Sequence, residues 1–306
     1  MSGQSDIKDR IGSVKNIEKI TRAMEMVAAA RLRRAEQRIE VLRPYASAIR
    51  RMTRDAAEAA GDVPDLPILK EREVKTVGLL LIAGDRGLAG AFNSTVVRAA
   101  TRAGREHERE GRKVLYFASG RRPASSLSFR GLEVADSFTG FTDRPAYADA
   151  RRIAERVMAA YIDEEVDQLE IFYNEYESAV SQNLKRETLL PLQKASVLEE
   201  GDDDSEAEGE DEADRERDKR ALVEYEPDPQ EILKRLVPDY VEVSIFRALL
   251  ESTASEHGSR MTAMRNASDN AGQLIDDLTL QMNRARQAEI TQEIMEVVAG
   301  AEGLTG

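Results

Sequence analysis

Apolar residues recur at steps of three or four near the start of the chain. With a mean step of 3.5 residues, they fall at Ile7, Ile11, Val14, Ile17, Ile20, Met24, Ala28, Leu32, Ala35, Ile39, Leu42, Ala46 and Ile49. This spacing is the heptad repeat of a coiled coil, whereas a straight helix repeats every 3.6 residues or so. Ser5 is a suitable N-cap, and Pro44 removes one backbone donor and should bend the helix. We predict an N-terminal coiled-coil helix over residues 1–60.

The C-terminal segment carries a second seam with the same kind of spacing. Its members are Met261, Met264, Ser268, Ala271, Ile275, Leu278, Met282 and Ala285. Pro238 is the last proline, and the DYVE after it resembles a capping box, so we predict a coiled-coil helix over residues 239–306. Neither helix is stable in water at this length unless its seam is buried. We expect the two helices to pair antiparallel, with a homodimeric coiled coil from one of them as the alternative.

The extreme C-terminus, ITQEIMEVVAGAEGL, is rich in apolar residues and has no basic residue. If the C-terminal helix extends beyond a shorter partner, this end has no cover within the chain. An exposed apolar surface of that kind usually marks the site of a binding partner. The alternative is that these residues form the buried end of a core helix.

Strand and helix patterns alternate over residues 74–198. Val74–Gly84, Lys113–Ser119 and Asp167–Ser178 are apolar enough for strands, and Pro145–Glu165 is an amphipathic helix. Strands separated by helices indicate a parallel sheet. The predicted fold class is therefore α/β plus a long antiparallel coiled coil, with a small, Rossmann-like central domain between the paired terminal helices.

The glycine-rich stretch GDRGLAG after the first strand resembles a phosphate loop at first sight. A Walker loop needs Lys and then Ser or Thr after its last glycine, but Gly90 is followed by Ala91. A dinucleotide fingerprint needs glycines at positions one, three and six, whereas Gly84, Gly87 and Gly90 are evenly spaced. We predict a tight strand-to-helix turn and no cofactor. A nucleotide-binding α/β protein with a coiled-coil dimerisation arm is the competing hypothesis.

The amino-acid composition argues against several kinds of metal-binding and catalytic site. The chain has no cysteine and only two histidines, which are far apart in sequence, so thiolate sites and histidine-built metal sites are not expected. No familiar catalytic motif is present, and we predict no catalytic, cofactor-binding or metal-binding residues. No stretch of 18 apolar residues and no apolar N-terminal signal occur, so we expect a soluble, cytoplasmic chain.

The net charge of −13 is concentrated in one segment. Glu199–Asp218 holds 13 acidic residues and two arginines, and the rest of the chain sums to only −2. We predict a disordered acidic insert over residues 199–220, because such a segment cannot bury apolar surface and lacks the spacing of an EF-hand. Residues 1–60 carry a net charge of +5, too weak a positive field for nucleic-acid binding without aromatic stacking.

Three motifs resemble the gamma subunit of the rotary, F-type ATP synthase. They are KITRAMEMVAAARLRRA (Lys19–Ala35), GDRGLAGAFN (Gly84–Asn93) and the nearly unbroken stretch Ser255–Leu304. With the rest of the coiled-coil arm they cover about half of the chain. The family usually has Cys and Gly where this chain has Ala89 and Ala91, and the acidic insert is not part of the common pattern.

The resemblance implies a non-catalytic rotor shaft. Its paired helices would stand within a ring of alpha and beta subunits, and its α/β domain would contact epsilon and the membrane c-ring. Proton flow would turn the ring and the shaft, and the shaft would drive the beta subunits through their catalytic states. The chain would then lie peripherally at the cytoplasmic face of the bacterial cell membrane, contact the membrane only through the c-ring, and bind no nucleic acid.

The resemblance also implies roles for particular residues. The bearing tip would be formed by Ile290, Ile294, Val297 and Val298. Asp85, Arg86, Gly87 and Gly90 would form the family's signature turn. The residues that would contact the beta subunits or support coupling are Met24, Arg31, Arg33, Arg34, Arg260, Gln287, Thr291 and Glu296, with Arg38 as a further member of the basic arm.

Overall fold

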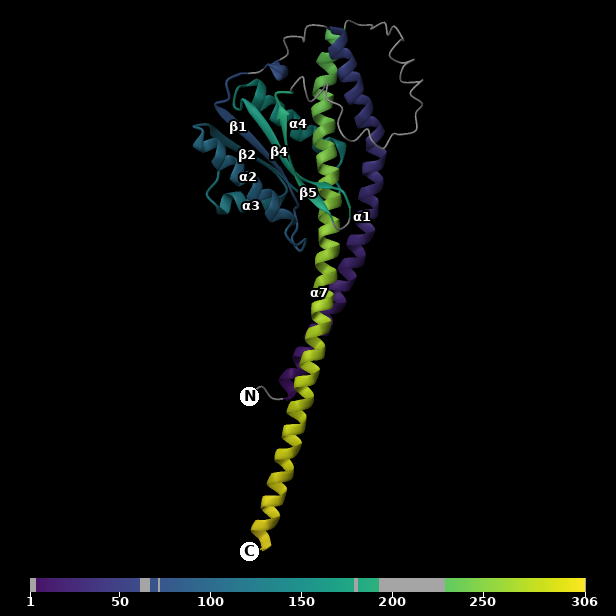
Figure 1. Cartoon of the computed structure of the whole chain (residues 1–306), viewed down its shortest axis with the longest axis vertical. Helices are drawn as coiled ribbons and strands as arrows, with labels where there is room; N and C mark the ends of the chain where they lie inside the picture. The colour runs from purple at the N-terminus through teal and green to yellow at the C-terminus, as the bar shows by residue number, and fades with distance from the viewer. Residues whose placement is uncertain (1–3, 61–66, 71, 179–180, 193–228, 306) are drawn as a thin grey trace. The chain divides into compact units, whose positions relative to one another are not determined.

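The computed structural model describes residues 4–60, 67–70, 72–178, 181–192 and 229–305 (Figure 1). The predicted acidic insert lies outside these described residues. The chain divides into two compact units, each described by itself below. One unit combines residues 1–31, 88–90 and 257–306, and the other combines residues 32–87 and 91–256.

The second unit is built on a five-stranded sheet with the order β3-β2-β1-β4-β5. The strands are β1 (Thr76–Ile82), β2 (Lys113–Ser119), β3 (Val134–Phe138), β4 (Gln168–Tyr176) and β5 (Gln182–Leu190). The first four strands pair in parallel, which confirms the parallel sheet predicted for β1, β2 and β4, but β5 pairs antiparallel with β4. The all-parallel expectation is wrong at this edge because the β4–β5 connection is too short for a crossover helix. β3 and β5 have too few apolar residues to stand out in the sequence.

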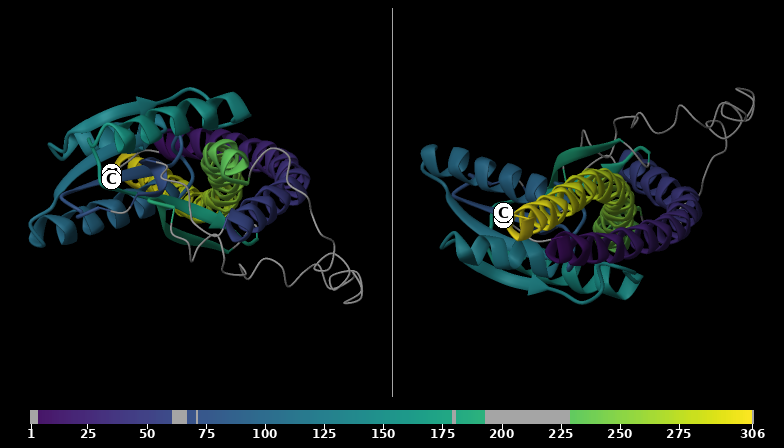
Figure 2. Two further views of the ribbon diagram at one scale, coloured as in Figure 1. Left: turned by 90° about the horizontal axis from the view of Figure 1, so that it is seen from above. Right: turned by 90° about the horizontal axis from the view of Figure 1, so that it is seen from below.

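Helices cover both faces of this sheet (Figure 2). α2 (Phe92–Arg109) and α3 (Arg121–Phe129) pack on one face, because the chain moves from β1 to β2 to β3 in one direction. The chain then returns to β4 past β1, so α4 (Tyr147–Ile162) lies on the opposite face. A short 3-10 helix, η1 (Pro67–Leu69), packs beside α4. The resulting order of layers is the Rossmann-like α/β arrangement that the sequence predicts.

The long C-terminal helix contributes directly to the core of this unit. α7 (Pro229–Thr305) places Val237, Val241 and Ile245 in the same apolar cluster as the sheet and α4. α7 therefore begins ten residues before the predicted start at Asp239, and Pro238 lies inside it. The proline costs one backbone hydrogen bond, but burial of the neighbouring apolar face outweighs that loss.

The first unit is an antiparallel helix pair. α1 (Gln4–Ala60) contributes its residues up to Arg31, and α7 contributes its residues from His257 onward. Ile7 and Ile11 pack against Leu278, while the Glu25 carboxylate receives a hydrogen bond from Arg265 Nε at 2.8 Å. Residue numbers rise along α1 as they fall along α7, so the helices run in opposite directions. This confirms the predicted intramolecular pairing.

The seam of α7 follows the predicted positions, but the seam of α1 departs from them. Met264, Ser268, Ala271 and Leu278 are buried, as expected. Ile17 and Ile20 are exposed instead, and Thr21 takes the buried position between them and Ala28. The Thr21 hydroxyl is accommodated because it donates to the backbone carbonyls of its own helix.

Candidate functional site

The carboxyl ends of the parallel strands are the edge where open α/β sheets bind ligands, at the point where strand order reverses. Here that point lies between β1 and β4. α7 occupies it. The Ser252 hydroxyl donates to the Ile82 carbonyl at the end of β1, and the Ser255 hydroxyl donates to the Asn174 carbonyl on β4. The Thr253 hydroxyl reaches the Thr142 carbonyl in the loop after β3.

All three of these α7 hydroxyls are at least 95% buried. A run of Ser and Thr in a long helix is unusual because these side chains compete with the helix backbone for hydrogen bonds. In this helix they satisfy carbonyl groups at the strand ends, which would otherwise face a ligand or water. The edge of the sheet that could bind a small molecule therefore holds the C-terminal helix.

Asp85 joins three loops at the same edge. One carboxylate oxygen accepts a hydrogen bond from the Arg121 N–H at the start of α3, at 2.9 Å. The other oxygen accepts from the Gly140 N–H at 2.8 Å and from the Thr142 hydroxyl at 3.0 Å. The start of a helix offers free N–H groups that favour an anion. In this chain the carboxylate of Asp85, the first residue of the signature turn, takes that position.

The glycines of this region allow close approach between backbone segments and side chains. A β-carbon at Gly84 would stand 2.8 Å from the carboxylate of Glu256 in α7. A β-carbon at Gly120 would stand 2.3 Å from the Ala83 carbonyl oxygen, and Gly120 also has a φ of +108°. These glycines are explained by packing within the chain, which supports the prediction of a turn and argues against the nucleotide-binding hypothesis.

The rest of the signature turn is held by Asn93 in α2. Its side-chain oxygen accepts from the Gly84 N–H at 2.8 Å, and its side-chain nitrogen donates to the Arg86 carbonyl at 3.0 Å. Gly87 approaches the Arg122 guanidinium, while Gly90 adopts a positive φ of 55°. Within the first unit, Gly90 lies beside the methyl group of Ala263 in α7.

The α1 residues that the resemblance predicts to contact the beta subunits differ in exposure. Met24 and Arg31 are half-buried, whereas Arg33 and Arg34 are exposed. Arg38 is held within the second unit, because its guanidinium donates to the Pro145 carbonyl. Burial and the nearby charge of Arg144 lower the pKa of Arg38.

Arg260 lies in α7 and is 92% buried. Its guanidinium lies 3.4 Å from Nδ1 of His257, one turn earlier in the same helix. A buried arginine cannot present a wide contact surface to another subunit. Of the two roles that the resemblance implies, support of the coupling region fits this position better than direct contact.

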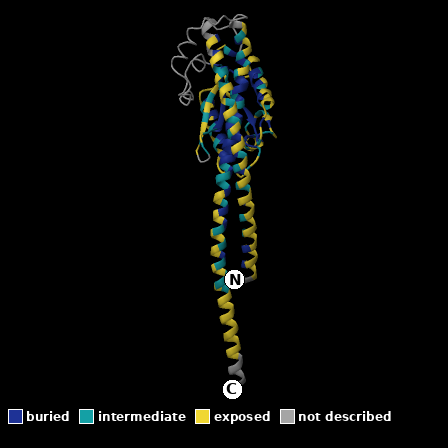
Figure 3. Cartoon of the chain, turned by 90° about the vertical axis from the view of Figure 1, so that its right-hand side faces the viewer, coloured by how far each residue is buried: buried dark blue, intermediate teal, exposed yellow. Residues whose placement is uncertain are grey.

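The C-terminal end of α7 has no cover within its unit. Every side chain from Arg286 to Ala299 is exposed, and these residues include Gln287, Thr291 and Glu296 (Figure 3). The four predicted tip residues are between 48% and 72% exposed, and Met295 adds another exposed apolar side chain. Ala285 still packs against the cluster of Ile7, Ile11 and Leu278, and α7 continues for about 30 Å beyond it, at 1.5 Å per residue. The predicted overhang is therefore present, and its apolar side chains face outward.

Comparison with known proteins identifies the family. A family model described as ATP synthase matches residues 3–304. A curated ATP synthase gamma chain from Trichormus variabilis is 43% identical over 320 aligned residues, with full coverage of both chains. One from Rubrobacter xylanophilus is 42% identical, with 99% of each chain covered. The chain belongs to the ATP synthase gamma-chain family.

Solved structures agree with this assignment. A chain from the central stalk and c-ring structure of the Tetrahymena thermophila mitochondrial ATP synthase is 26% identical, with a TM-score of 0.60. The match covers 81% of this gamma chain and 99% of the other. A chain from the Euglena gracilis mitochondrial enzyme, 16% identical, has the same fold with a TM-score of 0.68, over 98% and 94% of the two chains.

The gamma chain is a non-catalytic part of the rotary ATP synthase and serves as its central rotor shaft. No helix within the described ranges is both long enough and apolar enough to cross a membrane. Sequence reasoning missed the contact of α7 with the sheet edge, although the run ESTASEH was a signal for it. Short polar residues that interrupt an apolar helix pattern indicate buried hydrogen bonds to another element.

Proposed function

We propose that this gamma chain turns inside a ring of alpha and beta subunits, with its α/β domain against epsilon and the c-ring. It would lie peripherally at the cytoplasmic face of a bacterial membrane and reach the membrane only through the c-ring. The Tetrahymena relative comes from a central stalk and c-ring structure, and the Euglena relative from one that includes F1 and the c-ring. The curated relatives described above come from Trichormus variabilis and Rubrobacter xylanophilus.

The uncovered end of α7 carries this proposal. At about 100° per residue, Ile290, Ile294, Val297 and Val298 fall within an arc of about 100°. Glu289, Glu293 and Glu296 fall in a separate arc of about 60°. The tip is therefore apolar on one side and acidic on another. Apolar contact has no preferred hydrogen-bond direction, so such a tip can slide in an apolar sleeve.

The two arcs also make the tip asymmetric. A rotor needs such asymmetry if its rotation angle is to affect the beta subunits differently. A beta subunit that faces the acidic arc meets a different surface from one that faces the apolar arc. Gln287 and Thr291 lie on the same exposed stretch, where the Thr291 hydroxyl donates to the Gln287 carbonyl at 2.8 Å. Arg33 and Arg34 would add exposed ion pairs worth about 1 kcal/mol or less each, weak enough to break during rotation.

The proposal is tested by reconstitution with cognate alpha and beta subunits. We would measure complex formation by size-exclusion chromatography and then ATP hydrolysis for the full chain. Two variants are compared with it, one truncated before Ile290 and one with Ile290, Ile294, Val297 and Val298 replaced by serine. Phe129→Ser is the matched control, because Phe129 is an apolar side chain that is 93% exposed but lies in α3.

We expect the full chain and Phe129→Ser to assemble and support the same rate of hydrolysis. Both tip variants should assemble less tightly and hydrolyse ATP more slowly. Equal rates for the tip variants and the full chain would refute the bearing role of the tip. Failure of the full chain to join alpha and beta subunits would refute the wider partner assignment.

A further inference from the structure

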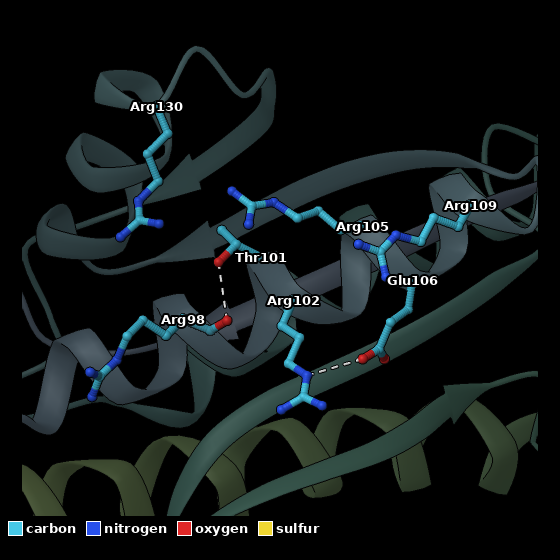
Figure 4. Close-up of a pocket in the computed structure, with 7 residues that line it drawn as sticks. All are labelled: Arg98, Thr101, Arg102, Arg105, Glu106, Arg109 and Arg130. Atoms are coloured by element: carbon cyan, nitrogen blue, oxygen red, sulfur yellow. Dashed lines mark hydrogen bonds and ion pairs between the residues drawn. The ribbon is translucent and has the colours of Figure 1, made fainter.

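The outward face of α2 carries a row of four arginines at helical spacing. Arg98, Arg102, Arg105 and Arg109 follow one another at steps of four, three and four residues. Side chains at this spacing lie on one side of a helix. Together with Arg130 at the end of α3, they line an open groove of about 340 Å³ (Figure 4).

This groove has far more positive than negative charge. Glu106 is the one acidic residue in its lining, and its carboxylate accepts from Arg102 Nε at 3.1 Å. Among the described residues, no carboxylate lies within ion-pair distance of Arg98, Arg105, Arg109 or Arg130. Arg98 Nε donates instead to the Ser94 carbonyl of its own helix. Several like charges held close together favour an acidic ligand that can neutralise them.

The groove lies close to the place where the acidic segment leaves the described fold. Arg186 in β5 approaches Glu106 in α2, with Nη1 and Oε2 3.7 Å apart. β5 then runs toward Leu190, which pairs with Leu169 near the start of β4. The C-terminal end of α2 lies at this same edge, where the parallel strands begin. α2 ends only a few residues before β2, and β2 begins at Lys113, which pairs with Thr76 at the start of β1.

Only a short linker separates the acidic residues from this part of the fold. The described range 181–192 ends at Leu192, and the first residue of the acidic run, Glu199, follows seven residues later. Seven residues span at most about 23–25 Å when extended. A ligand tethered this closely acts at an effective concentration in the millimolar range, so even weak ion pairs suffice to hold it.

We propose that Glu199–Asp218 of the same chain docks on the arginine groove of α2 and α3. The segment carries a net charge of −11, which complements the arginines, while the rest of the chain is nearly neutral. Guanidinium groups bind carboxylates through paired hydrogen bonds, so an acidic peptide suits this surface. The inference concerns the isolated chain and does not depend on its role as a rotor.

The proximity can be measured directly because the chain contains no cysteine. Ser205→Cys labels the acidic segment, and Glu108→Cys labels an exposed position of α2 beside the groove. Energy transfer between dyes on these two cysteines is recorded in the full chain at low salt and in 1 M salt. The screening length falls from about 10 Å at 0.1 M to about 3 Å at 1 M, so we expect transfer to fall as salt rises.

Three variants of this labelled chain separate the groove from general electrostatics. Replacing Arg102, Arg105 and Arg109 with glutamine should reduce transfer at low salt to the high-salt value. Replacing the same three residues with lysine should preserve most of the transfer. The matched control replaces Arg10, Lys15 and Arg22 with glutamine, which removes the same charge from exposed positions of α1 and should change nothing. Circular dichroism checks that each variant is folded.

Low transfer in the labelled parent chain, or equal loss in the groove and control variants, would overturn the proposal. Low transfer combined with groove-dependent binding to vesicles rich in phosphatidylglycerol would also overturn it and assign the groove to a lipid surface. Transfer that depends on salt and on the three groove arginines supports docking of the acidic segment.

Discussion

The carboxylate of Glu256 in α7 lies 2.8 Å from the point where a β-carbon on Gly84 would stand. Both residues are buried in the second unit, and Glu256 is only 2% exposed. The C-terminal helix and the glycine before the signature turn therefore approach each other so closely that a methyl group at residue 84 would displace the Glu256 carboxylate. This contact explains a glycine that resembled part of a phosphate loop.

Gly84→Ala should destabilise the protein by about 1–3 kcal/mol, because the added methyl group overpacks a buried site. The effect should shrink in a Glu256→Ala background, where the carboxylate is absent. Urea unfolding of the two single variants and the double variant measures this coupling. Additive effects of the two substitutions would show that the contact does not limit residue 84.

Asp85→Ala should cost about 2 kcal/mol, because it leaves the Arg121 N–H, the Gly140 N–H and the Thr142 hydroxyl without their shared acceptor. Asp85→Asn should cost less, since the amide keeps one acceptor oxygen. The measurement is thermal unfolding of each variant. A stability unchanged by Asp85→Ala would show that this carboxylate does not hold the three loops together.

Asp167 should make stability depend on pH. Burial opposes its charge, but the N–H groups of Thr76 and Lys75 and the guanidinium of Arg72 together lower the pKa of Asp167. A lowered pKa adds stability above the ordinary value of about 3.9, and this stability is lost as pH falls through the folded-state pKa. Asp167→Ala should therefore destabilise the protein by about 2 kcal/mol at pH 7, and by less near pH 3.

Urea midpoints of the wild type and Asp167→Ala at both pH values test this dependence. Asp163→Ala is the control, because Asp163 is an exposed aspartate at the end of α4. It should change stability by no more than about 0.5 kcal/mol at either pH. A larger loss for Asp167→Ala at pH 3 than at pH 7 would contradict the assigned direction of the pKa shift.

The register of the coiled coil predicts opposite outcomes for two isoleucines of α1. Ile11 is 8% exposed and packs against Leu278, so Ile11→Ala should cost about 2 kcal/mol. Ile20 is 59% exposed, so Ile20→Ala should change stability by less than about 0.5 kcal/mol. Thermal melts followed by helical circular dichroism compare the two. Equal losses of stability for the two variants would contradict the observed register and support the sequence-based one, in which both isoleucines lie in the seam.

The α1 seam shows where sequence periodicity is reliable and where it is not. A step of three or four specifies a stripe, but two adjacent stripes on one helix can both carry apolar residues. Ile17 and Ile20 fit the apolar heptad pattern, and Thr21 does not. Thr21 is nevertheless the buried residue, whereas both isoleucines are exposed. The position of the partner helix decides which of the two stripes is buried. A threonine can lie in the buried stripe because its hydroxyl can donate to a carbonyl of its own helix.

The sequence by itself determined the class of the protein: two long helices that are stable only when paired, an α/β domain encoded between them, and the family motifs. These follow from local periodicity and from spacing along the chain, which short-range geometry controls. Tertiary structure alone decided that α7 begins at Pro229 and that Ser252, Thr253 and Ser255 close the ligand edge of the sheet. Those contacts join residues more than 80 positions apart, and hydrogen bonds over such separations leave no periodic trace in the sequence.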